Sequence, residues 1–175
     1  MYRRLIPYLS ALLLLVSACS DDDPVAPGET TCPEAGTPAP ALVLDDLEGA
    51  THSLADYRCD QVVVLDFWAI WCSPCVEAMP DLQALHEQWA NRGVKVLSVN
   101  LGESRDLVQA FMDEGGYTFP VLLGSFEGIP EGYNVYAIPR QVVIDKAGEI
   151  RFAASGTGAI AGLNYDVILP ALLEE

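Results

Sequence analysis

The sequence predicts an α/β domain in which helices cover both faces of a central mixed β-sheet. Strand-like and helix-like segments alternate from residue 61 to residue 123, an order typical of strands joined by helices that pack on a sheet. The run 61–68 is apolar almost throughout, as expected for a strand that is buried on both faces. Two further strand-like segments flank the turn 146–148, and they predict a hairpin within the same sheet.

Six segments are predicted to be strands because short apolar runs in them are bounded by turn residues. In chain order they are 41–44, 61–68, 94–99, 119–123, 140–145 and 149–153. Residues 45–50, which include Gly49, are expected to form a turn after the first strand.

Three segments are predicted to be helices, at 74–91, 106–114 and 163–173. Each has apolar residues that are expected to face inward, and in the first helix they form a single stripe. These residues are Met79, Leu82, Leu85 and Trp89 in the first helix, and Leu107, Val108 and Phe111 in the second. Gly93 and the pair Gly115-Gly116 are placed to end these two helices, and Pro170 is expected to interrupt the third one late.

Residues 1–18 are predicted to be a lipoprotein signal peptide. Arg3 and Arg4 precede a short apolar run that is too short for a good transmembrane span. Val-Ser-Ala before Cys19 resembles a bacterial lipobox, which implies cleavage before Cys19 and attachment of lipid to it. Several acyl chains would anchor the protein firmly in a membrane of the cell envelope, facing the periplasm. The inner and outer membranes are not distinguished, and an ordinary signal peptide with an incidental Cys19 is the alternative.

Residues 19–40 are predicted to be a flexible tether, and residues 41–175 a single domain of ordinary size. The tether contains the aspartates 21–23 and continues with Pro, Gly, Thr and Ala, a composition that cannot bury a core. The chain has a net charge of −16, which becomes −18 once the two arginines of residues 1–18 are removed. Because nucleic-acid binding needs a basic patch, we expect no such partner; the acidic surface is interpreted as a solvated one, and we expect a monomer.

Residues 66–75 read Asp-Phe-Trp-Ala-Ile-Trp-Cys-Ser-Pro-Cys and place two thiols where a strand gives way to a helix. A helix N-terminus carries unpaired N–H groups and partial positive charge, which can lower a cysteine pKa to ~3.5–7.5. Because the thiolate is the form that attacks disulfides, Cys72 is predicted to be the nucleophile at an exposed helix start. Cys75, one turn further on, is predicted to be the shielded resolving thiol.

A structural zinc site or a static disulfide is the alternative role for this pair. A structural zinc usually has four ligands, and the sequence has neither a second C-x-x-C nor paired histidines. We therefore expect no metal and no cofactor other than the redox-active Cys72–Cys75 disulfide.

The strand, the aromatic pair, the W-C-x-P-C run and the helix resemble the thioredoxin superfamily. Over residues 37–173 the chain resembles the extracytoplasmic TlpA/ResA-like branch, a group of redoxin-domain proteins. The resemblance implies a thioredoxin-like fold and a thiol–disulfide oxidoreductase. Members are mostly reductants that act on protein disulfides or apocytochrome thiols and are recycled by a membrane electron carrier. One departure concerns the helix, where Ala78 stands in place of the usual Glu and Glu77 lies one position early.

Asp66 precedes Cys72 by six residues on the central strand. In thioredoxins the aspartate at the matching place is buried and handles the proton of the resolving cysteine, whereas TlpA-like chains more often carry Asn. Burial would raise the pKa of Asp66 and suit it to acid–base work near neutrality. The alternative is an aspartate at a strand end that faces water.

Ile138-Pro139 is the second landmark of the superfamily, since A-I-P-R-Q-V-V-I-D-K-A-G resembles G-x-P-T-T-x-x-I-D-x-x-G. The resemblance implies a cis proline that faces the dithiol, next to a backbone edge to which substrate pairs as a strand. Trp71, Ile138, Pro139 and Arg140 are therefore the expected substrate-binding residues. The alternatives are a trans proline at a strand start, Arg140 pointing to solvent, and a packing role for Trp71.

Cys32 and Cys59 remain after the other cysteines are assigned. Disulfides persist in exported proteins, so this pair is a candidate structural bridge that would contribute ~3 kcal/mol. Two unpaired thiols are the alternative. Members of the TlpA-like group commonly have Gly near position 59.

The leading hypothesis is an exported, membrane-anchored reductant of protein disulfides. A second is a redoxin-type thiol peroxidase, although such sites usually carry Thr three residues before the reactive cysteine, where this chain has Ala69. A third is a non-catalytic lipoprotein binding module with an inert disulfide. Copper chaperones of the Sco type use a distant histidine, and the only histidines are His52 and His86.

Overall fold

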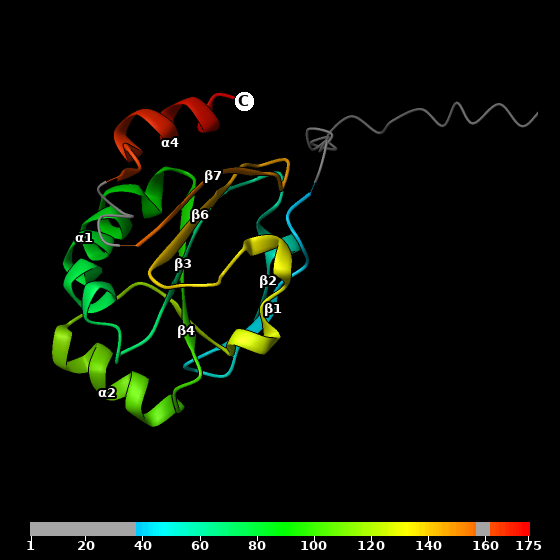
Figure 1. Cartoon of the computed structure of the whole chain (residues 1–175). Helices are drawn as coiled ribbons and strands as arrows, with labels where there is room; N and C mark the ends of the chain where they lie inside the picture. Colours follow the sequence, from blue (N-terminus) through cyan, green and yellow to red (C-terminus); the bar gives the residue numbers. More distant parts are fainter. Residues whose placement is uncertain (1–37, 157–161) are drawn as a thin grey trace, which may run out of the picture.

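The computed structural model describes residues 38–156 and 162–175 of the chain. These residues form one mixed sheet with three longer helices (Figure 1). The strands are β1 (Val43–Asp46), β2 (Thr51–Ser53), β3 (Val62–Trp68), β4 (Val94–Leu101), β5 (Val121–Gly124), β6 (Arg140–Ile144) and β7 (Ile150–Ser155). The longer helices are α1 (Ser73–Trp89), α2 (Arg105–Gly115) and α4 (Tyr165–Leu173).

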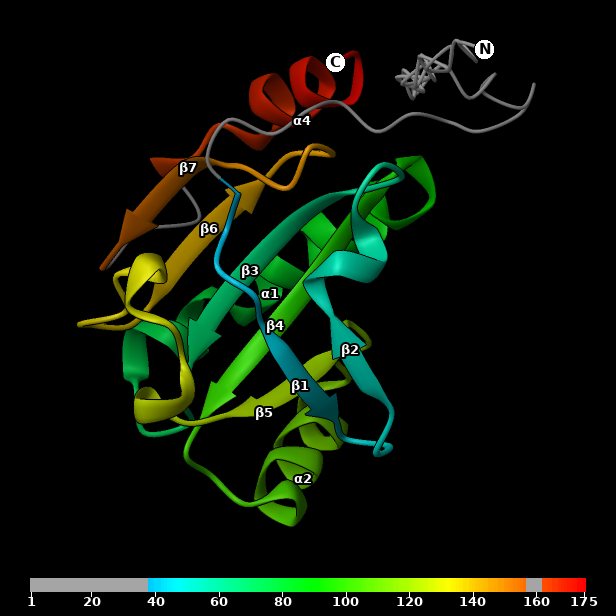
Figure 2. The ribbon, with the colours of Figure 1, turned by 90° about the vertical axis from the view of Figure 1, so that its right-hand side faces the viewer.

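The sheet has the strand order β2-β1-β5-β4-β3-β6-β7 (Figure 2). β3 pairs with β4, and β4 with β5, in parallel. β6 pairs with β3 and β7 in antiparallel fashion, as β1 does with β2 and β5. The apolar run predicted to be the central strand is therefore buried between two neighbours.

The two faces of β3 contribute to two separate hydrophobic cores. Val62, Val64 and Trp68 pack with α1, α2 and α4 in the first core. Val63, Leu65 and Phe67 point to the opposite face. That face is covered by short 3-10 helices and their loops, namely η1 (Leu54–Tyr57), η3 (Phe126–Gly128) and η4 (Glu131–Tyr133). Helices thus occur on both faces, but the three longer ones gather on one.

Most of the predicted elements are present with shifted ends. Met79, Leu82, Leu85 and Trp89 form the buried stripe of α1. After α1 a turn of 3-10 helix, η2 (Ala90–Arg92), is capped by Gly93 with a φ of 85°, and Gly116 caps α2 with a φ of 67°.

Three details of the prediction were wrong. Leu107 is 52% exposed because Val108 and Met112, one turn apart, form the buried stripe of α2. Pro170 does not interrupt α4, which continues to Leu173. The segment 45–50 is not all turn, since Asp45 and Asp46 extend β1 and pair with the short strand β2 and with β5.

The described chain makes contacts with the domain from its first residues. Pro38 forms an isolated bridge with Glu149, and the Ala39 N–H donates to the Gly148 carbonyl at 2.7 Å. The Tyr133 hydroxyl donates to the Pro40 carbonyl. Residues 38–40, the end of the predicted tether, therefore pack against the domain.

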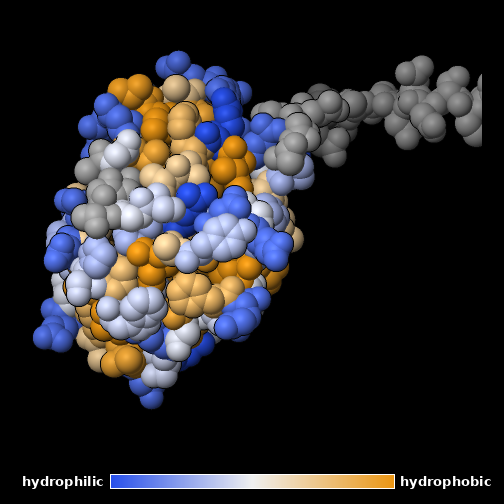
Figure 3. All heavy atoms as spheres, viewed as in Figure 1, coloured by the Kyte–Doolittle hydropathy of each residue, from blue (hydrophilic) through white to orange (hydrophobic). Residues whose placement is uncertain are grey.

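Hydrophilic residues are spread around the rim of the surface seen in Figure 3, and apolar residues reach the surface near its centre. Such a mixture is usual for a folded domain, because polar surface alone cannot cover it.

Candidate active site

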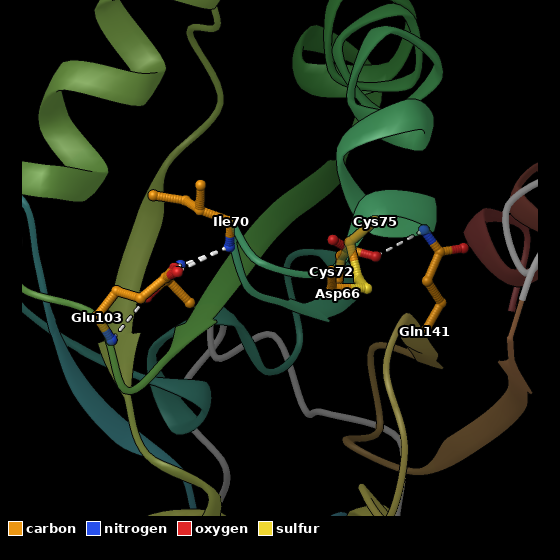
Figure 4. The surroundings of a disulfide bond; sticks show 7 residues. Asp66, Ile70, Cys72, Cys75, Glu103 and Gln141 are labelled. Atoms are coloured by element: carbon orange, nitrogen blue, oxygen red, sulfur yellow. Dashed lines mark hydrogen bonds between the residues drawn. A yellow bond between two sulfur atoms is a disulfide. The ribbon is translucent and has the colours of Figure 1, made fainter.

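The two cysteines lie at the start of α1, directly after β3. Cys72 is the N-cap residue, and its carbonyl accepts the N–H groups of Cys75 at 2.9 Å and of Val76 at 3.1 Å. No side chain caps this helix end, so its partial positive charge acts on the sulfur at the cap position. Cys72 and Cys75 form a disulfide with a Cα–Cα distance of 5.2 Å (Figure 4).

Cys72 is more buried than the sequence indicated. The predicted exposed helix start was wrong for this side chain, since Cys72 is 5% exposed and Cys75 is 2% exposed. Both belong to the core that α1 and α4 share with β3. The indole of Trp71, by contrast, is 64% exposed. The Cys72 sulfur therefore lies just below the surface, and the ring of the preceding residue is exposed.

Asp66 is buried on the same side of β3 as the cysteines. Asp66 lies two residues from Val64 and from Trp68 on β3, so it shares the face on which these two side chains meet the core that contains the disulfide. Figure 4 shows it on the disulfide side. Asp66 is 3% exposed. Burial raises its pKa from the ordinary 3.8 to about 6, although a hydrogen bond from Gln141 acts in the opposite direction. The expected burial of Asp66 is therefore present, and the alternative of a strand-end aspartate facing water is excluded.

Gln141 is the partner of Asp66 on the neighbouring strand. The two residues are opposite each other in the β3–β6 register, and Gln141 Nε2 donates to Asp66 Oδ1 at 2.9 Å. The other end of the amide is also occupied, because Gln141 Oε1 accepts the Tyr165 hydroxyl at 2.8 Å. A buried hydrogen-bonded chain, Tyr165–Gln141–Asp66, thus runs from α4 to β3 on the face that carries the dithiol. Sequence reasoning had singled out only Asp66.

Glu103 holds the loop that joins β3 to α1. Its carboxylate oxygens accept the Ile70 N–H at 2.8 and 3.1 Å, and Oε2 also accepts Asn100 Nδ2 at 2.6 Å. Figure 4 shows this contact on the side of the loop away from Gln141. Sequence reasoning missed Glu103 as well, because it lies 33 residues from Ile70 and follows a different strand.

The Ile138–Pro139 peptide bond is cis, as predicted. Pro139 is buried and Ile138 is half-buried, and Ile138 packs against both cores. Arg140 begins β6, where its Nε donates to the Tyr133 carbonyl at 3.1 Å and its Nη1 to Ser155 Oγ at 3.0 Å. These two hydrogen bonds hold the guanidinium against η4 and β7, so it has little freedom to turn toward a substrate.

Trp71 stacks on Phe126 of η3, with ring centroids 6.4 Å apart and an angle of 30° between the rings. Phe126 is itself 39% exposed. Trp68, the other tryptophan of the motif, is fully buried and packs against Phe111. The two tryptophans thus differ: Trp68 is part of the core, and Trp71 forms an aromatic surface beside the dithiol.

The comparisons with known proteins agree with this geometry. The model of the AhpC/TSA family matches residues 35–153. The chain belongs to the AhpC/TSA family. It is 39% identical over 129 residues to the thiol-disulfide oxidoreductase ResA of Geobacillus kaustophilus, a match that covers 74% of each chain. At this level of identity, and with the C-x-x-C pair in place, the protein is a ResA-like thiol–disulfide oxidoreductase.

Solved structures show the same fold. A putative thiol:disulfide interchange protein DsbE from Chlorobium tepidum superposes with a TM-score of 0.69 at 26% identity, covering 80% of this chain and 98% of the other. The pneumococcal exposed lipoprotein thioredoxin Etrx1 from Streptococcus pneumoniae superposes with a TM-score of 0.62 at 29% identity, covering 78% and 100%. The predicted thioredoxin-like fold and the predicted oxidoreductase activity of this AhpC/TSA member are therefore confirmed.

Several predicted features of this AhpC/TSA member concern residues outside the described range. Cys19 and Cys32 lie there, together with the predicted signal peptide and most of the tether. Cys59 is described and has a φ of 77°, a conformation that favours glycine. The Cys32–Cys59 bridge stays a prediction.

No group of three or more His, Cys, Asp or Glu side chains in residues 38–156 and 162–175 is arranged to hold a metal ion. Within the same residues, no helix has the length and apolar character needed to cross a membrane.

Proposed function

We propose that this oxidoreductase is an exported protein, anchored to a membrane of the cell envelope through lipid on Cys19, that reduces disulfides of protein substrates. Cys72 is the nucleophile, Cys75 the resolving thiol and Asp66 the proton acceptor. The observation that supports these roles best is the dithiol at the uncapped start of α1, which shares a core face with a buried carboxylate whose pKa is about 6.

The reaction consumes the reduced dithiol. The Cys72 thiolate attacks one sulfur of the substrate disulfide, that bond breaks, and the other substrate sulfur leaves as a thiolate that takes a proton from water. Cys75 then gives its proton to the Asp66 carboxylate and attacks Cys72 Sγ. The Cys72–Cys75 disulfide forms and the second substrate sulfur leaves, so the substrate gains two electrons and the protein loses two.

A dithiol must restore the reduced form after each cycle. We propose a membrane electron carrier with its own thiol pair, because a lipid anchor on Cys19 would keep the domain close to such a carrier. Etrx1, to which the chain is similar, is described as an exposed lipoprotein. Replacement of Cys19 by Ser should abolish incorporation of labelled fatty acid, and persistent labelling would contradict the anchor.

Trp71, Ile138, Pro139 and Arg140 are proposed to bind the substrate polypeptide. Trp71 offers an exposed ring, and the segment before β6 offers backbone to an extended chain. Since the Arg140 guanidinium already holds Tyr133 and Ser155, its proposed part is to support the binding segment as well as to supply positive charge.

The roles of the two cysteines are tested by matched single substitutions. Cys72→Ser should reduce the rate of insulin-disulfide reduction to the uncatalysed background, because the attacking thiolate is lost. Cys75→Ser should turn over equally slowly but accumulate a Cys72 mixed disulfide with the substrate, visible as a mass increase under non-reducing conditions. A mixed disulfide that forms on Cys75 in Cys72→Ser instead would reverse the assignment.

The direction of electron flow is tested by the reduction potential of the Cys72–Cys75 pair. A value of about −270 mV or below fits a reductant, and a value near −120 mV fits an oxidant. A potential in the latter range would contradict the proposed reducing role and would leave the thiol–disulfide exchange itself intact.

A peroxidase activity is the second candidate, because the matching family model also covers AhpC-type proteins by its description. Ala69 offers no hydroxyl three residues before Cys72. We expect hydrogen peroxide consumption by the reduced protein, in the presence of a recycling thiol, to stay at the rate of a free cysteine. Turnover well above that rate would favour the peroxidase.

A further inference from the structure

The chain Tyr165–Gln141–Asp66 has a defined direction of hydrogen bonding. Each side chain is nearly or fully buried: Gln141 is 0% exposed, Asp66 3% and Tyr165 7%. Tyr165 donates to Gln141 Oε1, and Gln141 Nε2 donates to Asp66. An amide accepts through its oxygen and donates through its nitrogen. In the arrangement present, the Tyr165 hydroxyl donates to the amide oxygen, so the amide nitrogen is the end of Gln141 that meets the carboxylate.

We propose that Tyr165 is a positioning residue, which orients the Gln141 amide so that its N–H group stabilises the carboxylate form of Asp66 over the protonated form. The inference rests on the role of Asp66 in the proposed function. In the observed orientation the amide offers a donor, which a carboxylate needs. In the flipped orientation it would offer Oε1, which only a protonated Asp66 can satisfy.

Few other groups near Asp66 can compete with the Gln141 amide for its carboxylate. On the same face of the sheet lie the Cys72–Cys75 pair from α1 and Tyr165 from α4, and Ser98 of β4 and Gln141 of β6 are the register partners of Asp66. Of these, only the cysteines and Tyr165 titrate, and burial raises the pKa of Tyr165, so its hydroxyl stays protonated and able to donate. The orientation of one amide therefore has a large influence on the proton affinity of Asp66.

Tyr165 also connects the hydrogen-bonded side chains Tyr165–Gln141–Asp66 to the surface of the domain. It lines a groove between α1 and α4, together with polar residues that include Asp81, Gln88 and Asp166. Gln88 Nε2 donates to Asp166 Oδ1 at 2.9 Å and so links the two helices. The Tyr165 hydroxyl thus links α4, which contacts α1 here, to the Gln141 amide.

The test is the titration of the Asp66 carboxyl, followed by carbon NMR in the oxidised full-length protein, in which the cysteines do not titrate. Gln141→Met removes the donor at similar side-chain length and should raise the proton affinity of Asp66 about tenfold. Tyr165→Phe keeps the ring and frees the amide to flip, and should raise it about threefold. Tyr133→Phe is the matched control, because it removes a buried tyrosine hydroxyl from the opposite face, and it should leave the titration unchanged.

If the Asp66 carboxyl titrates at the same pH in Tyr165→Phe as in the wild type, the positioning role is overturned. The phenylalanine variant is nearly isosteric, so this measurement remains decisive even where Gln141→Met fails to fold. The rate at which Cys75 resolves the mixed disulfide should also reach its half-maximum at a higher pH in Tyr165→Phe. Resolution that is unimpaired in Asp66→Asn would contradict the proposed function of Asp66 instead, and the NMR titration would still report on Tyr165.

Discussion

The two faces of the sheet each bury a tyrosine, but the two hydroxyls donate to different kinds of acceptor. On the face opposite the dithiol, Tyr133 donates to a backbone carbonyl, that of Pro40, and packs on Phe67. On the dithiol face, Tyr165 donates to a side chain, Gln141, which in turn donates to a buried acid. The first arrangement ties the start of the domain to η4, and the second controls a titrating group.

The difference extends to the cores around the two tyrosines. The buried core opposite the dithiol consists of apolar residues and Tyr133. The dithiol face buries Asp66, Ser98 and Gln141 in addition to its apolar residues. Among the described residues Asp66 has no cation beside it, and such a buried carboxylate costs stability, so the dithiol face accepts a loss of stability for the sake of chemistry.

The largest effect on stability is expected from Asp66→Asn. Asp66 keeps its proton up to a pH of about 6 in the folded protein but loses it near 3.8 when unfolded. The free energy of unfolding therefore falls as the pH rises through this window. The variant lacks this penalty, so at pH 7 it should be more stable than wild type by ~3 kcal/mol, with no difference below a pH of about 3.8.

Denaturant unfolding of both proteins from pH 3 to pH 8 measures this difference. Asp145→Asn is the matched control: Asp145 is also buried, but it forms an ion pair with Arg151 at 2.8 Å and accepts the Glu149 N–H. That variant should be less stable than wild type at pH 7. A gain of stability in both variants would show that the effect is not specific to the dithiol face.

The loop that carries the dithiol is tested by Glu103→Ala. The substitution leaves the Ile70 N–H and the Asn100 amide without their carboxylate acceptor, and should cost about 2 kcal/mol of stability. Because Ile70 leads directly to Cys72, the alkylation rate of reduced Cys72 should change as well. Glu114→Ala, at an exposed position of α2, should change neither quantity; a normal alkylation rate in Glu103→Ala would restrict Glu103 to a stabilising role.

The smallest effect is expected from Tyr133→Phe. Loss of one buried hydrogen bond to a backbone carbonyl should cost about 1 kcal/mol, measured by denaturant unfolding. The reduction potential of the Cys72–Cys75 pair should not move, since Tyr133 faces the other core. A shifted potential would mean that the two faces are coupled through β3 and would weaken the comparison between them.

The sequence determined the reacting groups and the elements that carry them. The apolar run of β3, the stripe of α1 and the W-C-x-P-C motif are local patterns, and local patterns follow from the spacing of residues along one strand or helix. The position of Cys72 at a helix start could therefore be predicted from the pattern. The burial of Asp66 was expected from its apolar neighbours together with the resemblance to thioredoxins, and the cis bond before Pro139 from that resemblance alone.

Only the tertiary structure decided which side chains surround these groups. Gln141 lies 75 residues from Asp66, Tyr165 lies 24 residues from Gln141, and Glu103 lies 33 residues from Ile70. These contacts depend on the β3–β6 register and on how α4 and the end of β4 pack, and no short-range spacing encodes them. The burial of Cys72 and the exposure of Leu107 escaped prediction for the same reason, because a side chain's exposure is decided by what packs on it from elsewhere in the chain.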